Sequence, residues 1–333
     1  MRIVHAVRSD GFSGVERHVA TLAAAQCRVG HAVIVIGGDE SMMHSALADT
    51  SVRTIQGRTV TEVARNLRRI RRADIVHAHM TAGELAASVA ATSPIVVTRH
   101  FARARGATPV GRLSGVVIRR RVGAQIAISR YVADRIDGEA TVVYPGVEPV
   151  ATTSVDRRPV VLVVQRLQPE KSTDVALRAF AAGAPSGWTL QVVGRGAELP
   201  ALEALAEELG ISGRTDFLGF RDDVPELMRA ASALIAPCAV EGLGLSVLEA
   251  MAHGLPVLAS YAGAHPETVG LADDAQLFAP GSVEDAGAML ARLCTDAAFR
   301  DGYGEQLAQV QRADFTPEAQ AAGTEAVYRA VLG

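Results

Sequence analysis

The sequence predicts an α/β protein of two doubly wound domains that face each other across a cleft. Three observations support this prediction. Short β-branched runs alternate with amphipathic helical patterns along the whole chain. The alternation stops at a proline- and glycine-containing stretch, residues 144–158, and then restarts, as expected for a linker. The length of 333 residues suits two domains of about 150 residues each.

The apolar runs are expected to form buried parallel strands, each followed by a helix. In the first half these runs are residues 3–7, 33–36, 75–78, 95–98 and 125–128, and in the second half 160–164, 190–193, 233–236 and 256–259. The last stretch, residues 316–332, has a helical pattern and could pack on either domain. Because open sheets of this kind bind ligands beyond the carboxyl ends of their strands, we expect the site in the inter-domain cleft.

Composition argues for a globular, cytoplasmic protein. No apolar run approaches the roughly 18 residues that a membrane span requires, and residues 1–7 lack a signal-peptide pattern. Cys27, Cys238 and Cys294 are scattered and odd in number, which favours reduced thiols and a cytoplasmic location.

Basic residues are concentrated in the first half of the chain. Residues 1–150 hold 20 arginines against 12 acidic residues, although the net charge of the whole chain is −3. The excess lies in two clusters, which are Arg65, Arg68, Arg69, Arg71 and Arg72, and Arg119, Arg120 and Arg121. They are either solvated helix faces or a surface for an anionic acceptor or an anionic membrane, with a peripheral place at its inner face. Aromatic residues are too sparse beside them to indicate nucleic acid.

A glycine-bearing turn, residues 9–14, follows the first expected strand and opens a helix. Such a turn presents N–H groups to an anion. The turn is weak evidence by itself, and its glycine spacing is not the dinucleotide fingerprint.

Lys171 is the only lysine in the chain, since every other basic residue except histidine is arginine. It follows the first strand of the second half, in the segment 165–172. A lysine is a compact point charge that suits a phosphate oxygen in a tight corner. Arg166 and Lys171 could together clamp a diphosphate; the alternative is a lone surface lysine at a helix start.

Two carboxylates, Glu241 and Glu249, bracket a glycine-rich turn and the start of a helix. The turn can offer N–H groups to phosphate or sugar oxygens, with the helix dipole behind it. We place Glu249 about two turns into this helix, roughly 10 Å or more from Glu241. This separation fits the two ends of a nucleotide-sugar better than the catalytic pair of a glycosidase.

The segment 241–249, continued by residues 250–257, resembles the E-x7-E signature of family 4 retaining glycosyltransferases of the GT-B fold. Segments 165–171, 193–196, 217–219 and 263–267 agree with the family in the same order, so the resemblance covers essentially the whole chain. It implies two Rossmann-like domains. Residues 1–150, with a C-terminal helix at about 316–333, would form the acceptor-side domain, and residues 151–315 the donor-binding domain.

The resemblance also implies roles for individual residues. Arg166 and Lys171 would bind the donor diphosphate, Glu241 the hydroxyls of the sugar, and Glu249 the ribose. His100 would lie beside the transferred sugar, and Gly14 near the diphosphate. The other donor-binding residues of the turn and helix start would be Gly242, Leu243, Gly244, Leu245 and Ser246.

The sequence departs from the family pattern at three places. Gln165 and Ser13 stand where the family usually has glycine, and Phe101 stands where it often has aspartate. His77 and His79 also end a strand facing the expected cleft, in a structural or acceptor-lining role. A zinc site is not expected, because no third ligand stands at metal spacing.

The predicted reaction is retaining transfer of a hexosyl-type sugar from a UDP- or GDP-type donor to a lipid-linked, phosphorylated or small natural-product acceptor. Fixed positive groups would stabilise the leaving phosphate, so no metal or other cofactor is expected. The alternatives are a sugar-nucleotide epimerase of the GT-B fold and a non-catalytic nucleotide-sugar binding protein.

Overall fold

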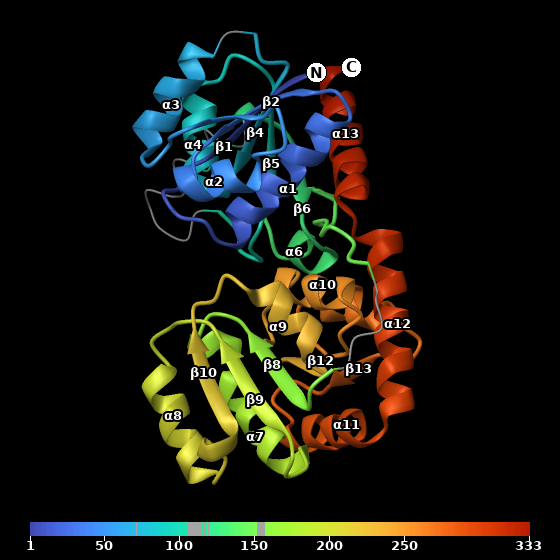
Figure 1. Cartoon of the computed structure of the whole chain (residues 1–333). Helices are drawn as coiled ribbons and strands as arrows, with labels where there is room; N and C mark the ends of the chain where they lie inside the picture. Colours follow the sequence, from blue (N-terminus) through green and yellow to red (C-terminus); the bar gives the residue numbers. More distant parts are fainter. Residues whose placement is uncertain (71, 106–114, 116–117, 119, 152–156) are drawn as a thin grey trace. The chain divides into compact units, whose positions relative to one another are not determined.

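The computed structural model describes residues 1–70, 72–105, 115, 118, 120–151 and 157–333 (Figure 1). The chain forms two units. The first contains Met1–Gly146 and Thr316–Gly333, and the second contains Val147–Phe315. The chain therefore passes between units at Gly146–Val147 and at Phe315–Thr316, close to the boundaries of 150–151 and 315–316 that the sequence suggests.

Within its described residues, the first unit contains a seven-stranded parallel sheet in the order β3-β2-β1-β4-β5-β6-β7. Its strands are β1 (Arg2–Val7), β2 (Ala32–Ile36), β3 (Arg53–Ile55), β4 (Ile75–His79), β5 (Ile95–Arg99), β6 (Val122–Ala127) and β7 (Thr141–Val142). Its helices are α1 (Gly14–Arg28), α2 (Glu40–Ala46), α3 (Val60–Arg69), α4 (Met80–Ala90), α6 (Arg130–Ala133) and α13 (Pro317–Leu332).

Alternate side chains of the strands pack on opposite faces of this sheet. Val4 and Ala6 of β1 pack against apolar residues of α3 and α4. Ile3 of the same strand packs on the other face, where Val327 and Tyr328 of α13 lie. The last helix of the chain thus completes the core of the first unit.

The second unit repeats this topology with a six-stranded parallel sheet, again in its described residues, in the order β10-β9-β8-β11-β12-β13. Its strands are β8 (Val160–Val164), β9 (Thr189–Val193), β10 (Thr215–Gly219), β11 (Ala233–Ala236), β12 (Val257–Ser260) and β13 (Gln276–Phe278). Its α-helices are α7 (Thr173–Gly183), α8 (Leu199–Glu208), α9 (Val224–Ala230), α10 (Leu245–Ala252), α11 (Val283–Thr295) and α12 (Ala297–Asp314).

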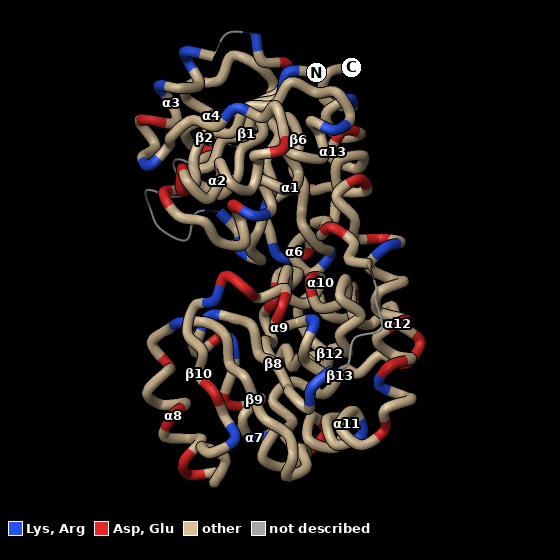
Figure 2. Tube along the Cα trace, in the orientation of Figure 1, with Lys and Arg blue, Asp and Glu red and all other residues tan. Residues whose placement is uncertain are grey.

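Several inner strands are uncharged, and β8 and β11 are apolar along their whole length. The strands β2, β4, β8 and β11 contain no lysine, arginine, aspartate or glutamate, and β8 is uncharged along its whole length in Figure 2. Strands covered by helices on both faces need such runs. The nine strands expected from the sequence are all present, each within three residues of its expected start.

Four strands were not expected, and all four lie at sheet edges. They are β3, β7, β10 and β13. Three of them are only partly buried, and Asp216 within β10 is exposed. An edge strand with one covered face does not need a continuous apolar run, so it lacks the signal that marks the central strands.

The described part of the stretch between the units, residues 143–151 with 157 and 158, contains neither helix nor strand, in agreement with a linker. Among the described residues no helix combines the length and apolar character needed to cross a bilayer. Cys27, Cys238 and Cys294 are free thiols.

Candidate functional site: a lysine–glutamate pair and a histidine cluster

The loops after β8 and β11 meet at the topological switch point of the second sheet. These two strands are neighbours, and the sheet grows from them in opposite directions. A crevice forms at such a point outside the carboxyl ends of the strands, and ligands of doubly wound folds bind there. Lys171 comes from the first loop and Glu241 from the second.

Lys171 and Glu241 form an ion pair. The distance from Lys171 Nζ to Glu241 Oε2 is 2.6 Å, and the side chains are 15% and 22% exposed. Burial opposes ionisation of Glu241, but the charge and hydrogen bond of Lys171 outweigh it and hold the pKa of Glu241 below its usual value. Two residues predicted separately as diphosphate and sugar ligands are therefore direct partners.

Gln165 anchors the loop that carries this lysine. Lys171 ends the short 3₁₀ helix η1 (Pro169–Lys171), and Ser172 after it has a left-handed backbone with φ 52°. The side-chain amide of Gln165 donates to the Lys171 carbonyl at 3.0 Å and to Thr173 Oγ1 at 2.9 Å. Glycine, usual at this place in the family that the sequence resembles, has no side chain to make these bonds.

Arg166 pairs with a different carboxylate, that of Glu170. Its side chain is 67% exposed, and its Nη2 lies 3.1 Å from Glu170 Oε1. The sequence places Arg166 and Lys171 together as a diphosphate clamp, but in the structure the two cations have different carboxylate partners.

The start of α10 offers backbone donors beside Glu241. Gly244 precedes the helix with φ 88°, a left-handed conformation that favours glycine. Leu245 and Ser246 begin the helix, where amides have no acceptor within the helix and the dipole is positive. Gly242 and Leu243 complete the turn, and Leu243 is buried, so it presents backbone rather than side chain.

Residues 263–265 close against the backbone of Glu241. The Ala264 N–H donates to the Glu241 carbonyl at 3.0 Å. A Cβ on Gly263 would lie 2.6 Å from that carbonyl oxygen, so only glycine fits there. His265 follows, fully buried, and its Nδ1 lies 3.0 Å from the Ser260 carbonyl. Its Nε2 is buried with no hydrogen-bond partner among the described residues, and burial lowers its pKa although Glu241 opposes this.

Glu249 is the fifth residue of α10, because the helix begins only at Leu245. The expectation of two helical turns before Glu249 was therefore wrong; it lies little more than one turn in. Its side chain is half-buried.

In the first unit, the turn after β1 leads into α1, whose first residue is Gly14. Glu16 Oε2 accepts from the Ser13 N–H at 2.9 Å and from Ser13 Oγ at 2.7 Å. Burial opposes ionisation of Glu16, yet hydrogen bonds from Ser9 and Ser13 hold its pKa below its usual value. A diphosphate near Gly14 would therefore meet a negative charge already present at this helix start.

His100 belongs to a cluster of five buried histidines in the first unit. His5, His77 and His79 have no exposed surface, whereas His18 is 5% and His100 8% exposed. Burial lowers the pKa of His5 and of His100 to about 4, and that of the other three well below 6.5, so all five are neutral at pH 7. The complete burial of His77 and His79 agrees with the structural role rather than the acceptor-lining one.

Histidine ligand atoms come together at metal-binding distances in the folded chain, although the sequence spacing predicted no third ligand. The ligand atoms of His5, His77 and His79 lie within 4.8 Å of one another, and so do those of His18, His79 and His100. Residues far apart in sequence converge here because β1 and β4 are neighbours and pair His5 with His77.

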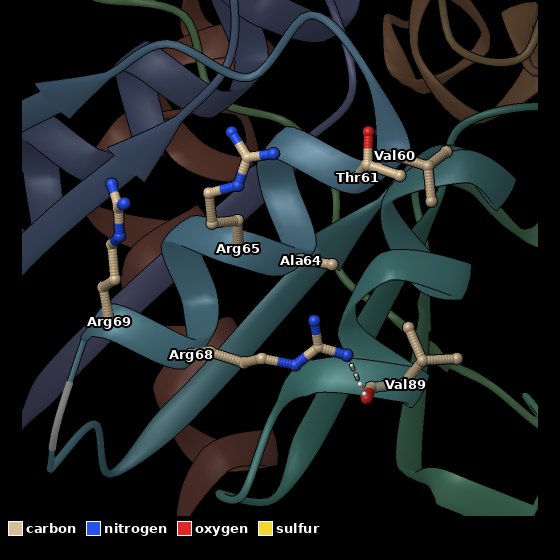
Figure 3. A pocket seen from close by; sticks show the side chains of 7 residues that line it. All are labelled: Val60, Thr61, Ala64, Arg65, Arg68, Arg69 and Val89. Carbon is tan, nitrogen blue, oxygen red and sulfur yellow. Dashed lines mark hydrogen bonds between the residues drawn. The ribbon is translucent and has the colours of Figure 1, made fainter.

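Arg65, Arg68 and Arg69 of the first arginine cluster line a surface hollow of about 440 Å³ between α3 and α4 (Figure 3). Arg65 and Arg69 project from α3 in a similar direction, while Arg68 reaches towards α4 and donates to the Val89 carbonyl at 3.4 Å. The hollow is lined by Val60, Thr61, Ala64, Arg65, Arg68, Arg69 and Val89. Arg71 and Arg119 lie outside the described residues. In the second cluster, Arg121 is committed to the Ala91 carbonyl at 2.6 Å.

Sequence reasoning missed His5, His18, Gln26 and Tyr328 around His100, and His265 beside Glu241. A signal was present for part of this set. His77 and His79 alternate with apolar residues in β4, as His5 does in β1, which places polar rings on one face of buried strands. For Gln26 and Tyr328, on helices from opposite ends of the chain, no local pattern exists.

Comparison with known families assigns both halves of the chain. Residues 12–150 match the family model described as Glycosyltransferase Family 4. Residues 148–310 match the model described as Glycosyl transferases group 1.

Several curated proteins are similar in sequence. A lipopolysaccharide core biosynthesis mannosyltransferase of Rhizobium leguminosarum bv. viciae is 32% identical over 233 residues, which cover 64% of this chain and 66% of that protein. The 2-deoxystreptamine glucosyltransferase of Streptomyces kanamyceticus is 32% identical over 204 residues, covering 59% and 53%. A D-inositol 3-phosphate glycosyltransferase of Mycobacterium bovis is 35% identical over 238 residues, covering 63% and 47%. The chain thus spans about half to two thirds of the length of these relatives.

Solved structures share the fold over the whole chain. Anabaena Alr3699/HepE in complex with UDP and glucose has a TM-score of 0.81 at 20% identity, covering 99% of this chain and 100% of that one. WaaG, a glycosyltransferase involved in lipopolysaccharide biosynthesis, has a TM-score of 0.72 at 20% identity, covering 97% and 99%. With two consecutive family matches and this likeness of fold, the chain belongs to the family 4-like glycosyltransferases of the GT-B fold.

Proposed function

We propose that this protein is a retaining glycosyltransferase that moves a hexosyl-type sugar from a nucleotide-diphosphate sugar to an acceptor hydroxyl. The observation that carries the proposal is the Lys171–Glu241 pair at the switch point of the second sheet, with the N-terminus of α10 beside it. A cation and free helix amides suit a diphosphate, and a carboxylate suits sugar hydroxyls.

The second unit would bind the donor. Lys171 and Arg166 would contact the diphosphate, Glu241 the sugar hydroxyls and Glu249 the ribose. Backbone N–H groups around Gly244 and Leu245 would hold the sugar and phosphate oxygens. The solved complexes of Alr3699/HepE with UDP and with UDP-glucose support a UDP-sugar as donor.

The first unit would supply the acceptor side, with Gly14 near the diphosphate and His100 beside the transferred sugar.

In the reaction, the bond between the anomeric carbon and the diphosphate oxygen breaks, and negative charge develops on the leaving phosphate. Lys171, Arg166 and the α10 amides would stabilise this charge, which is the role a metal has in other transferases. The acceptor hydroxyl would attack on the leaving-group face and give its proton to the phosphate oxygen, so that the anomeric configuration is retained. We therefore propose that the reaction needs no divalent ion.

The acceptor class is open among three kinds, and the named relatives include one of each. Their printed names describe lipopolysaccharide core synthesis, 2-deoxystreptamine and D-inositol 3-phosphate. The arginine-lined hollow on α3 supports an anionic acceptor or a peripheral contact with an anionic membrane, and the free thiols support a cytoplasmic location.

The test is a thermal-stabilisation screen of UDP- and GDP-sugars, followed by transfer assays on the three acceptor classes with and without EDTA. A donor at 100 times its dissociation constant adds about 2.7 kcal/mol to stability. We expect one donor to stabilise the protein, and transfer to retain the anomeric configuration by NMR. An isomerised donor without acceptor would identify an epimerase instead, and binding without any turnover a non-catalytic binder.

A further inference from the structure

Four of the five cluster histidines, His5, His77, His79 and His100, belong to one continuous hydrogen-bond network on a single face of the first sheet. His5 lies on β1, His77 and His79 on β4, and Thr98 on β5. Two helices complete it, α1 with Gln26 and α13 with Tyr328. Three of these histidines, His5, His79 and His100, form a chain of contacts. Of the three, only His100 has any exposed surface.

The network has two branches, and both start at the side-chain amide of Gln26. In the first, Gln26 Oε1 lies 2.7 Å from His5 Nε2, His5 Nδ1 lies 3.0 Å from His79 Nε2, and His79 Nδ1 lies 3.1 Å from His100 Nε2. In the second, Gln26 Nε2 lies 3.2 Å from the Tyr328 hydroxyl, which lies 2.6 Å from His77 Nδ1, and His77 Nε2 lies 2.7 Å from Thr98 Oγ1.

Each ring in the network is neutral, so each has one donating and one accepting nitrogen. The direction of one hydrogen bond therefore sets the direction of the next. Gln26 Oε1 can only accept, so His5 carries its proton on Nε2 and accepts at Nδ1. By the same step His79 carries its proton on Nε2 and accepts at Nδ1, and His100 must donate from Nε2.

The second branch is consistent with the first. The Gln26 amide nitrogen donates to the Tyr328 oxygen, so the Tyr328 hydroxyl donates to His77 Nδ1. His77 then carries its proton on Nε2 and donates to Thr98. With these contacts, reversing the first branch requires the Gln26 amide to turn over, which would also reverse the second branch.

We infer that Gln26, acting through His5 and His79, is a positioning residue that fixes His100 as the tautomer protonated on Nε2. The remaining nitrogen of His100, Nδ1, is then an acceptor, so a hydroxyl group that meets it must donate. The inference rests on the proposed function only for the ligand that meets His100. Three buried residues, Gln26, His5 and His79, thus determine the tautomer of His100.

Metal binding is the rival use of the same rings. A divalent cation at either histidine triplet needs ring lone pairs that the network already uses between rings. Both triplets consist of imidazoles alone. Metal binding is therefore one of the outcomes that would overturn the inference.

The first experiment needs no substrate, and it uses a variant only to assign signals. The full chain, labelled with ¹⁵N-histidine, is examined at pH 7.5 by long-range ¹H–¹⁵N NMR, which distinguishes protonated from bare ring nitrogens. His100 is assigned by the signals that disappear in His100→Ala. We expect Nε2 of His5, His79 and His100 to be protonated and Nδ1 bare; protonation of His100 on Nδ1 overturns the inference.

The second experiment compares Gln26→Met with Gln26→Glu. Methionine has a similar volume but cannot accept from His5, so we expect His100 to lose its single-tautomer signal while far-UV circular dichroism is unchanged. Glutamate still accepts from His5, so the His100 signal should stay that of the wild type. An unchanged His100 tautomer in folded Gln26→Met contradicts the inference. A shift of the His100 ring signals of the wild type on adding one equivalent of ZnCl₂ also contradicts it.

These results separate the inference from the proposed function. If the NMR pattern holds but no nucleotide-sugar is turned over, the proposed function fails and the network stands. If transfer is observed but the His100 tautomer does not depend on residue 26, only the inference fails.

Discussion

At the scale of single residues, Lys171 stands out because no other lysine occurs in the chain. Arginine serves at all 32 other cationic positions, so lysine here points to a requirement that a planar guanidinium does not meet. The structure supplies a physical reason, since the ammonium of the mostly buried Lys171 side chain lies 2.6 Å from Glu241.

Replacing this lysine should affect both the reaction and Glu241. We expect Lys171→Met to lower kcat on the order of a hundredfold or more, because the leaving phosphate loses a fixed positive charge. The pKa of Glu241 should rise, since burial is then no longer offset. Lys171→Arg keeps the charge, so its kcat should lie between those of the wild type and Lys171→Met.

Arg166→Ala should also lower kcat by this order. Near-wild-type rates in both Lys171→Met and Arg166→Ala would contradict the mechanism. The measurements are steady-state kinetics and a ¹³C NMR titration of Glu241.

A second residue-scale prediction concerns the buried ion network of the first unit. Glu84 is 1% exposed and accepts from Arg105 Nε at 2.6 Å, and Arg105 and Arg99 both bond to Asp137. Glu84→Ala leaves buried guanidinium groups without this partner and should cost about 3–5 kcal/mol. Glu318→Ala removes the partner of Arg28 in an exposed pair, 45% and 60% exposed, and should cost about 1 kcal/mol or less. Urea unfolding of both variants decides; equal losses would contradict the burial argument.

At the scale of elements, the start of α10 depends on the left-handed backbone of Gly244. An added Cβ would also lie 3.2–3.3 Å from Val247 and Glu241 side-chain atoms. Gly244→Ala should therefore cost about 1–2 kcal/mol and weaken donor binding. Gly302 lies within α12 with open space around its Cα, so Gly302→Ala should stabilise the same unit by about 0.5–1 kcal/mol. Thermal unfolding and donor titration of the two variants test this, and stabilisation by both would contradict it.

Two helices of the second unit share one cap. Arg157 donates from its guanidinium to the carbonyls of Met228 in the last turn of α9 and Ala231 just after it. It also donates to the carbonyls of His253 and Gly254 after α10. These are carbonyls that a helix end leaves unsatisfied, and a cation there also opposes the dipole. Arg157→Met should destabilise the second unit on the order of 3 kcal/mol. Arg157→Lys, which keeps the charge but not the planar fork, should lose part of this. The fluorescence of Trp188, the single tryptophan, reports unfolding of this unit, and an unchanged midpoint for Arg157→Met would refute the cap.

Element prediction succeeded where burial is two-sided and failed where it is one-sided. The run 160–164 was placed to the residue, because every position of this central strand is apolar. The edge strand β3, Arg53–Ile55, carries an exposed arginine and only three residues, which no periodicity distinguishes from a loop. The start of α10 was placed too early for a related reason, since the turn before it is as apolar as the helix.

At the scale of the whole molecule, the two units should respond differently to acid. His5 and His100 have a pKa of about 4 when folded, against 6.5 ordinarily, and burial also lowers the pKa of His18, His77 and His79. The unfolded chain therefore takes up protons first as the pH falls through 6.5. This contribution to stability is full above about pH 6.5 and declines towards pH 4, by up to about 1.4 kcal/mol per pH unit for each histidine.

Hydrogen exchange measured between pH 7.5 and pH 5 tests this difference within one molecule. Protection of β1 and β4 in the first unit should fall more steeply with acid than that of β8 and β11. Among the described residues of the second unit, burial lowers the pKa of one histidine, His265, against five in the first unit. Equal acid sensitivity in the two sheets would show that the histidine cluster does not stay neutral on folding.

The sequence by itself determined the alternation of strands and helices, the break between two doubly wound halves, the family, and Lys171 and Glu241 as site residues. Each of these depends on near neighbours in the chain or on residue types at a fixed spacing. Only the tertiary structure decided that Lys171 pairs with Glu241, that Arg166 does not, and that four histidines join Gln26 and Tyr328 in one network. Those contacts join residues up to 302 positions apart, and which of them meet depends on the order of strands in a sheet and on where the last helix packs.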